Sequence, residues 1–358
     1  MFSTLGNRVV VSMVHTAPFA VTGSRVRGRM KTDSRMKRFA IIGVGGYVAP
    51  RHLKAIKDTG NVLEAALDPN DSVGVMDGFF PDADFFTEFE RFDRHIDKLR
   101  RKGPEKSVEY VSICSPNYLH DAHIRFALRS RAHAICEKPL VLNPWNVDAL
   151  KEFEKESDKK VYTILQLRKH PAVIELKRQV ESDPEAAKKI YDIDLTYITS
   201  RGRWYQISWK GDQEKSGGVA TNIGIHFFDM LLWIFGPVKH STVHVSDKTR
   251  AAGYLELERA RVRWFLSLEK SDLPSSSLQK GQSTYRAIRI ESSNFEFSGG
   301  FTNLHTISYK SILAGEKGFG LDDGRPSIQL AHDIRVEKPN PRSGEKHPLT
   351  EKVLRTLN

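Results

Sequence analysis

Cysteine is scarce in this sequence, because Cys114 and Cys136 are the only two among 358 residues. Both lie within apolar, strand-like runs, VSICSP and HAICEKP, and neither belongs to a spacing typical of metal ligands. Two cysteines cannot form the disulfide framework of small secreted domains, so a fold of that kind is excluded. We expect buried free thiols, which are typical of a reducing compartment such as the cytoplasm.

Long apolar runs are also missing, since no stretch approaches the roughly 18 apolar residues that a membrane span needs. We therefore expect no membrane partner. Hydrophobic residues make up 39% of the chain and charged residues 28%, as in a globular protein of two ordinary domains.

Acidic residues are nearly absent from the first 38 residues, where Asp33 stands against eight lysines and arginines. This segment carries +7 of the formal net charge of +11, which leaves +4 for the rest of the chain. The rest lacks a basic stripe interleaved with aromatic residues, so we expect no nucleic-acid partner. We expect residues 1–35 to be a disordered extension, with Met36 as an alternative start of the protein.

From Lys37 onward, short apolar runs alternate with segments of helical periodicity. The predicted strands are RFAIIG, VLEAALD, the segment around Phe85–Phe86, YVSICSP, AHAICEKPL and KVYTILQLRKHP. The predicted helices are APRHLKAIKDTG, residues 90–101, HDAHIRFALRS and residues 144–157. This alternation predicts an α/β domain with a doubly wound, mostly parallel sheet over residues 36–168.

After Arg168 the pattern changes to a helix, HPAVIELKRQVES, followed by several strand-like runs. These runs are YDIDLTYIT, STVHVSD, AGYLELE, RVRWFLSLE, YRAIRIES and NFEFSG, with helices around Gly218–Phe235 and Asn303–Gly315. Consecutive strands of this kind predict an open, mostly antiparallel sheet in an α+β domain over residues 169–358.

A glycine-rich turn, Gly43, Gly45 and Gly46, joins the first strand to the first helix. Glycines at such a turn let the backbone approach a pyrophosphate, which the helix N-terminus then binds. The third glycine of G-x-G-x-x-G is replaced by Val48, so a plain strand–helix turn is the alternative. We predict a cofactor site formed by this turn with Tyr47 and Val48.

Asp68 ends the second strand, 25 residues after Gly43, in the sequence DPND. An acid at this place accepts both ribose hydroxyls and repels a 2′-phosphate, which predicts NAD rather than NADP. Asn70 follows in the same cofactor site. The alternative is that Asp68 caps the turn that follows it.

The stretch AHAICEKPL reads as a buried strand that stops at Pro139, which cannot donate to a sheet ladder. Glu137 and Lys138 then lie at the carboxyl end of a strand, where parallel sheets bind ligands, and we predict that both contact the cofactor. Burial there lowers the pKa of a lysine, so Lys138 becomes usable in proton transfer. A surface lysine in a turn is the alternative. The preceding strand ends in Ser115 and Asn117, with His120 close by, and we predict that these contact the cofactor unless they serve only the turn.

The segment SGGVATNIGIHFFDMLLWIFG places Asn222, His226 and Asp229 at helical spacing on one face. Inward polar groups on an apolar helix are unfavourable unless they meet a ligand or each other. A histidine of the core and a metal ligand are the alternatives, but no third ligand is evident, so we predict no metal.

Four of these motifs together, GVGGYVAPRHL, SPNYLH, EKPL and GG-x(3)-N-x-G-x-H, resemble the Gfo/Idh/MocA oxidoreductase family over about residues 37–335. The resemblance implies a Rossmann domain, NAD as cofactor, and a second domain over residues 169–358 that binds substrate and whose sheet mediates dimers or tetramers. It implies that Lys138 contacts a substrate hydroxyl and the nicotinamide, and that His226 is an acid/base. Many members have Asp where this chain has Asn222, which leaves the base role to His226 or Lys138.

Longer segments, among them GGYVAPRHLKAIKDTGN and RGRWYQISWKGD, resemble a narrower group of the family, the bacterial UDP-N-acetylglucosaminuronate (UDP-GlcNAcA) 3-dehydrogenases. That resemblance implies NAD-dependent oxidation of the sugar 3-hydroxyl in lipopolysaccharide O-antigen biosynthesis. It implies a substrate site with Lys138, Asn222 and His226, in which Arg168 or Arg203 holds a carboxylate or diphosphate unless they are only solvated charges.

Other functions remain open at this point. One alternative is a dehydrogenase of a free sugar or inositol, and another is a non-catalytic regulator that binds a dinucleotide. A third is a metal-dependent hydrolase that uses His226 and Asp229.

Overall fold

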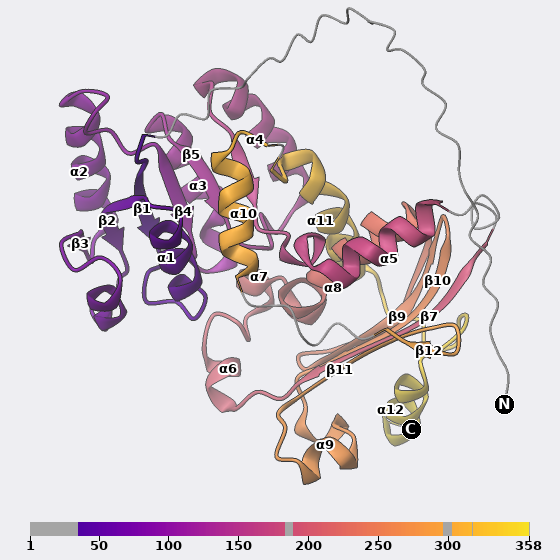
Figure 1. Cartoon of the computed structure of the whole chain (residues 1–358). Helices are drawn as coiled ribbons and strands as arrows, with labels where there is room; N and C mark the ends of the chain where they lie inside the picture. Colours follow the sequence, from indigo (N-terminus) through magenta and orange to yellow (C-terminus); the bar gives the residue numbers. More distant parts are fainter. Residues whose placement is uncertain (1–34, 183–188, 296–302, 317, 358) are drawn as a thin grey trace, which may run out of the picture. The chain divides into compact units, whose positions relative to one another are not determined.

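A computed structural model describes residues 35–182, 189–295, 303–316 and 318–357 of the chain. These residues contain two six-stranded sheets, each with its own hydrophobic core (Figure 1). The prediction for residues 1–35 lies, apart from Arg35, outside the described residues, and so does most of the predicted strand NFEFSG. Cys114 and Cys136 are buried free thiols, as predicted.

The first sheet, sheet A, is parallel throughout and has the strand order β3-β2-β1-β4-β5-β6. Its strands are β1 (Arg38–Ile42), β2 (Val62–Leu67), β3 (Asp84–Phe86), β4 (Tyr110–Ile113), β5 (His133–Cys136) and β6 (Val161–Thr163). The strand order reverses between β1 and β4, and this switch point is where doubly wound sheets bind dinucleotides. The predicted parallel sheet is thus confirmed.

Helices cover both faces of sheet A, and two of them come from the far end of the chain. The helices that follow the strands are α1 (Ala49–Asp58), α2 (Phe89–Arg101), α3 (His120–Arg129) and α4 (Pro144–Ser157). Helix α10 (Leu304–Leu313) joins the cluster of α1, and helix α11 (Leu321–Val336) joins that of α2, α3 and α4. The core around sheet A therefore includes residues that follow residue 300.

The second sheet, sheet B, has the order β12-β11-β7-β10-β9-β8, and only its β7–β10 pair is parallel. Its strands are β7 (Tyr191–Thr199), β8 (Val238–Ser246), β9 (Arg250–Leu257), β10 (Ala260–Ser267), β11 (Thr284–Ile290) and β12 (Ser293–Asn294). The predicted open, mostly antiparallel sheet is confirmed.

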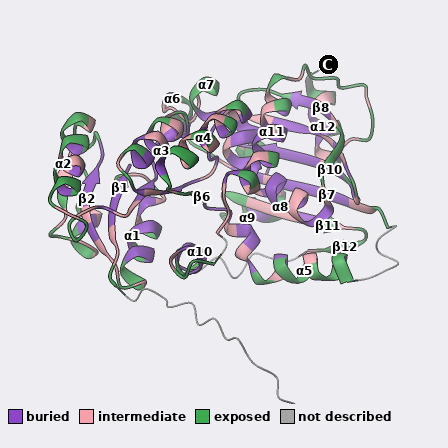
Figure 2. Ribbon diagram, turned by 90° about the horizontal axis from the view of Figure 1, so that it is seen from above, coloured by how far each residue is buried: buried purple, intermediate pink, exposed green. Residues whose placement is uncertain are grey.

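The two faces of sheet B pack against different helices. Helices α5 (Pro171–Ser182) and α8 (Ile225–Phe235) lie on one face, where alternate strand residues such as Leu195 and Trp264 are buried (Figures 1 and 2). Helix α12 (Pro348–Leu357) lies on the other face, beside Ile198 and Phe265. Three short helices, α6 (Arg203–Ile207), α7 (Gln213–Ser216) and α9 (Ser275–Gln279), complete this part.

One helical stretch, Gln213–Phe235, is long and apolar enough by composition to cross a membrane. However, 72% of its apolar window is buried inside the protein. Most of its large side chains belong to the core beside sheet B, which accounts for their apolar character without a membrane.

Two features differ from the sequence prediction. The strand expected over KVYTILQLRKHP covers only Val161–Thr163, and a 3₁₀ turn, η3 (Gln166–Lys169), follows it. Helices α11 and α12 lie outside the elements that the sequence predicts, and α11 contains Gly324 and Pro326, which are unfavourable within a helix. It forms because Leu321, Ile328 and Ile334 become buried, and this tertiary packing outweighs local propensity.

Candidate active site at the carboxyl edge of sheet A

The glycine turn after β1 fits closely against the neighbouring strand ends. Gly43 has φ of +84°, and a Cβ on it would lie 2.6 Å from the backbone nitrogen of Ser115. Gly45 donates its N–H to Asp68 Oδ2 at 2.8 Å, so the end of β2 fixes the turn. Asp68 Oδ1 accepts the N–H of Asn70 at 2.9 Å. Asp68 thus caps its own turn and also supports the glycine turn.

The backbone after the glycines can receive an anion. The N–H groups of Tyr47 and Val48 make no hydrogen bond within the described residues, and they directly precede α1. The Tyr47 ring is 87% exposed, with the Arg51 guanidinium 5.3 Å from its centroid. Unpaired N–H groups at a helix N-terminus are a general site for phosphate groups, so the predicted pyrophosphate role of this turn fits the geometry.

The residues predicted after β4 hold strand ends together. The His120 ring lies between two carbonyls, with Nε2 2.8 Å from Ser115 O and Nδ1 2.7 Å from Pro139 O. Burial lowers the pKa of His120, so its neutral ring donates to one of the two carbonyls. The Ser115 hydroxyl lies 2.8 Å from His123 Nδ1. Asn117 donates to Ser216 O at 2.9 Å. These contacts bring the ends of β4 and β5 close to α7.

Lys138 and His226, predicted from separate motifs, line one small cavity together with Thr163 and Ser327. Lys138 Nζ donates to the backbone oxygen of Asn222 at 3.2 Å. Burial lowers the pKa of Lys138, while the Glu137 carboxylate opposes that shift. Burial, and then the Lys138 charge, hold the pKa of His226 well below its usual value. A neutral imidazole therefore lies beside a lysine at the edge of sheet A.

Asn222 lies in a π-helical turn, η5 (Ala220–Gly224), which directly precedes α8. Its Nδ2 donates to the Tyr205 hydroxyl, and its Oδ1 accepts from Asn117 Nδ2 at 3.4 Å. π-Helical turns are frequent at functional sites. The amide is therefore held from two sides while its backbone oxygen accepts from Lys138.

The structure places the two predicted substrate arginines elsewhere. Arg168 is buried, and its Nε and Nη2 donate to the two Asp229 oxygens at 2.9 and 2.7 Å. Its Nη2 also donates to Asp323 O at 2.9 Å. Arg168 is thus not in the cavity of Lys138 and His226, and Asp229 is its ion-pair partner. Arg203 is exposed at the start of α6.

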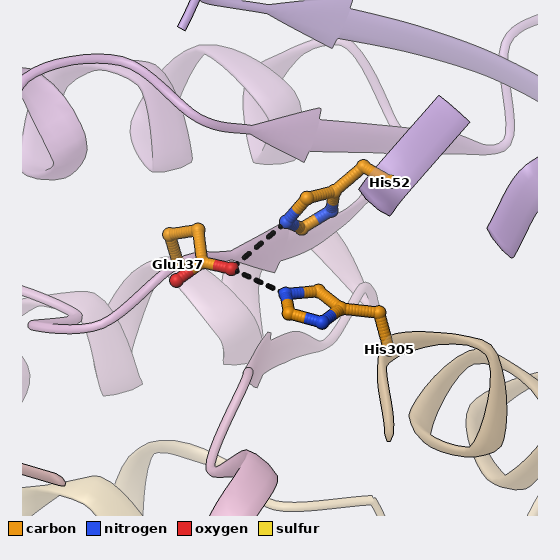
Figure 3. A group of neighbouring side chains, drawn as sticks. All are labelled: His52, Glu137 and His305. Atoms are coloured by element: carbon orange, nitrogen blue, oxygen red, sulfur yellow. Dashed lines mark hydrogen bonds and ion pairs between the residues drawn. The ribbon is translucent and has the colours of Figure 1, made fainter. Parts of the chain in front are cut away.

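Glu137, predicted as a cofactor ligand, is buried and bonded to two histidines. Its Oε1 accepts from His52 Nε2 at 3.0 Å and from His305 Nε2 at 2.8 Å (Figure 3). Neither histidine was predicted as a site residue from the sequence, and neither were Tyr309 and Thr163. A signal existed for His52, which shares the inward face of α1 with Leu53 and Ile56. His305 carries no comparable signal in the sequence.

The strand order of sheet A and the glycine turn define a dinucleotide-binding Rossmann domain. The lysine and histidine beside it are of the type that dehydrogenases use for proton transfer. The chain belongs to the Gfo/Idh/MocA oxidoreductase family. Residues 37–165 match its NAD-binding Rossmann-fold model, and residues 188–338 match its C-terminal alpha/beta-domain model. The predicted family and the NAD cofactor are thus confirmed.

Among solved structures, the chain is similar to the WlbA (WbpB) dehydrogenase of Thermus thermophilus, with 51% identity and a TM-score of 0.83. The match covers 88% of this chain and 100% of that one. That enzyme was crystallised with NAD and alpha-ketoglutarate and, at 50% identity to this chain, with NAD and UDP-GlcNAcA. The WlbA dehydrogenase of Bordetella pertussis is 16% identical with a TM-score of 0.68 over 84% of this chain and 94% of that one, and shows the fold alone.

Among curated proteins, glucose-6-phosphate 3-dehydrogenase of Bacillus subtilis is 25% identical over 209 residues. The match covers 56% of this chain and 54% of that enzyme, so the chain spans about half the length of this relative.

Proposed function

We propose that this protein is an NAD-dependent dehydrogenase that oxidises the 3-hydroxyl of UDP-GlcNAcA to the 3-keto sugar. The observation that carries the proposal is the cavity shared by Lys138 and His226 at the carboxyl edge of sheet A, the edge at which the glycine turn also follows its strand. The Thermus thermophilus neighbour, 50% identical and crystallised with NAD and UDP-GlcNAcA, supports the same substrate.

The chemistry follows from the charges of the two residues. Oxidation of a secondary alcohol removes a proton from oxygen and a hydride from carbon. Because burial and the Lys138 charge hold its pKa below the usual value, His226 is neutral at pH 7, and the ring nitrogen that carries no proton accepts the proton of the hydroxyl. The Lys138 ammonium donates a hydrogen bond to the same oxygen and stabilises the charge that develops there. NAD supplies the hydride acceptor.

An anionic substrate suits the surroundings of Lys138. Arg51 and Arg201 are close enough to lower the pKa of Lys138, and Arg201 also lowers that of Lys210. Arg51, Arg201 and Lys210 form no ion pair within the described part of the chain, and Arg51 and Lys210 lie over aromatic rings instead. Unpaired cations that gather at one site favour a ligand that carries negative charge. We propose that they bind the carboxylate or diphosphate of the UDP-sugar.

Turnover of UDP-GlcNAcA with NAD is the direct test, with glucose-6-phosphate and inositol as control substrates. His226→Asn is expected to lower kcat by about a hundred- to ten-thousandfold, because it removes the proton acceptor. Lys138→Met is expected to lower kcat with NAD affinity retained. If His226→Asn keeps turnover within about threefold of the parent, Lys138 is the base instead. If both variants stay active, the site lies elsewhere.

We further propose a homo-oligomer, a dimer or tetramer, that works in the cytoplasm in O-antigen sugar biosynthesis. The name of the Thermus thermophilus neighbour supports this role, and native mass spectrometry would give the subunit count. Since that neighbour binds alpha-ketoglutarate, we propose that the same compound reoxidises NADH here. A single-turnover assay with and without it is the test, and an unchanged rate of NADH loss would contradict this step.

A further inference from the structure

Glu137 is the centre of a buried network that the reaction scheme above does not use. Its Oε1 accepts from His52 on α1 and from His305 on α10, two helices far apart in the sequence (Figure 3). Its Oε2 accepts the backbone N–H of Lys138 at 3.2 Å. The carboxylate is therefore held from both sides, directly before the lysine of the active site.

The network continues outward to β4. His52 Nδ1 lies 2.7 Å from the Tyr309 hydroxyl, which lies 2.6 Å from Ser112 Oγ. With the proton of His52 on Nε2, Ser112 donates to Tyr309, Tyr309 donates to His52, and His52 donates to Glu137. Ser112, Tyr309, His52 and Glu137 are then all hydrogen-bonded while His52 is neutral. Burial lowers the pKa of His52, which agrees with the neutral form.

The carboxylate in this network is an anion. Burial alone would raise the pKa of Glu137, but the hydrogen bonds from His305 and His52 hold it well below its usual value. An acid with two N–H donors on one oxygen stays ionised even when it is buried. Its negative charge then lies beside Lys138, whose pKa it raises against the effect of burial.

The same three side chains bring ligand atoms within 4.8 Å of one another, as in a metal site. Distances decide between the two interpretations. Tetrahedral ligands at about 2.0–2.1 Å from zinc are about 3.3 Å apart. The observed separations from Glu137 Oε1, 3.0 Å to His52 and 2.8 Å to His305, are instead those of N–H···O hydrogen bonds. The distances therefore favour hydrogen bonds among the three side chains over a metal ion bound by them.

We propose that His52 and His305 are positioning residues, which hold the Glu137 anion in place so that it fixes the charge and the location of the Lys138 ammonium. The catalytic part of this inference rests on the proposed function. Four other ionisable side chains also interact with Lys138. They are Arg51 from α1, His120 from α3, Arg201 after β7 and His226 from α8. Arg51 and Arg201 are cations and the two histidines are neutral, so none of these four groups can replace the anion, and Glu137 is the acid among these neighbours.

Glu137→Gln tests the charge with little change of shape. Without the anion, Lys138 loses its proton at a lower pH. The high-pH limb of kcat is then expected to move down by about one pH unit. The pKa of Lys138 can also be measured from the pH dependence of its acetylation by acetic anhydride, followed by mass spectrometry. It is expected to fall as well. An unmoved limb together with an unmoved titration would overturn the proposal.

His305 tests the positioning. His305→Ala removes one donor and is expected to lower kcat about tenfold with KM nearly unchanged, a usual effect of a lost supporting residue. His305→Gln keeps an N–H donor and is expected to restore most of kcat. His305→Ala is expected to have little further effect in a Glu137→Gln background, because the histidine acts through the carboxylate. If the losses of kcat in Glu137→Gln and His305→Ala add fully in the double variant, the role of His305 is merely structural. An equal loss of kcat in His305→Ala and His305→Gln would show the same. His240→Ala, at an exposed histidine of β8, is the matched control.

Two readouts separate this inference from the proposed function. If the parent does not turn over UDP-GlcNAcA, the proposed function fails, but the acetylation of Lys138 still reports on Glu137. If Glu137→Gln does not fold, the two His305 variants carry the test. Metal analysis of the purified parent is expected to find no stoichiometric ion. One ion per chain that is lost in His305→Ala would replace the proposal with a metal site.

Discussion

Asp229→Asn is expected to destabilise the protein strongly, because it removes the carboxylate that compensates a buried arginine. The side chains of Arg168 and Asp229 are only 7% and 3% exposed, and two hydrogen bonds of 2.9 and 2.7 Å join them. Breaking such a pair from one side typically costs about 3–5 kcal/mol. Asp323 still accepts from Arg168, at 2.9 Å through its backbone oxygen, so we expect the lower end of that range, about 3 kcal/mol.

Thermal and urea unfolding would measure this effect, and a loss of about 3 kcal/mol corresponds to a Tm lower by about 6–10 °C. The double variant Arg168→Met/Asp229→Leu removes both charges, so its stability is expected to lie within about 1–2 kcal/mol of the parent. Arg325→Met is the matched control, because the Arg325–Asp148 pair has the same geometry at the surface and contributes at most about 1 kcal/mol.

The same double variant distinguishes the structural role of Arg168 from the substrate role that the sequence suggested. With a structural role, KM for UDP-GlcNAcA stays close to that of the parent. If the folded double variant instead loses substrate affinity a hundredfold or more, about 2.7 kcal/mol, Arg168 binds substrate and this reasoning is wrong. A loss below about 1 kcal/mol in Asp229→Asn would also refute it.

Two further predictions concern the cofactor and the effect of pH. Asp68 at the end of β2 predicts tighter binding of NAD than of NADP, and Asp68→Ala should narrow that difference in calorimetry; equal affinities in the parent would contradict this. Burial lowers the pKa of His123 and of His347 to about 4, below the value of about 6.5 in the unfolded chain. Stability present above pH 6.5 is therefore lost as the pH falls toward 4, by about 1.4 kcal/mol for each histidine at pH 5.5. The loss of unfolding free energy between pH 7.5 and pH 5.5 should be smaller in the double variant His123→Gln/His347→Gln than in the parent. An unchanged loss would exclude these two histidines as its cause.

Much of the fold could be predicted because its signals are local. A glycine turn after an apolar strand and a proline directly after EK act through steric limits within a few residues. These limits located the turn at Gly43 and the end of β5 before Lys138, and both agree with the structure. Helix α11 escaped prediction because its glycine and proline are unfavourable locally, while the burial that stabilises it comes from distant segments.

Local patterns in the chain were enough to predict the two sheets, the glycine turn, and a joint role for Lys138 and His226. The partners of the buried charges depend on the packed fold instead. Arg168 pairs with Asp229, 61 residues away, and Glu137 with His52 and His305, 85 and 168 residues away. No short-range pattern specifies such pairs, because a buried charge is stabilised by whichever groups the packed core brings within hydrogen-bonding distance.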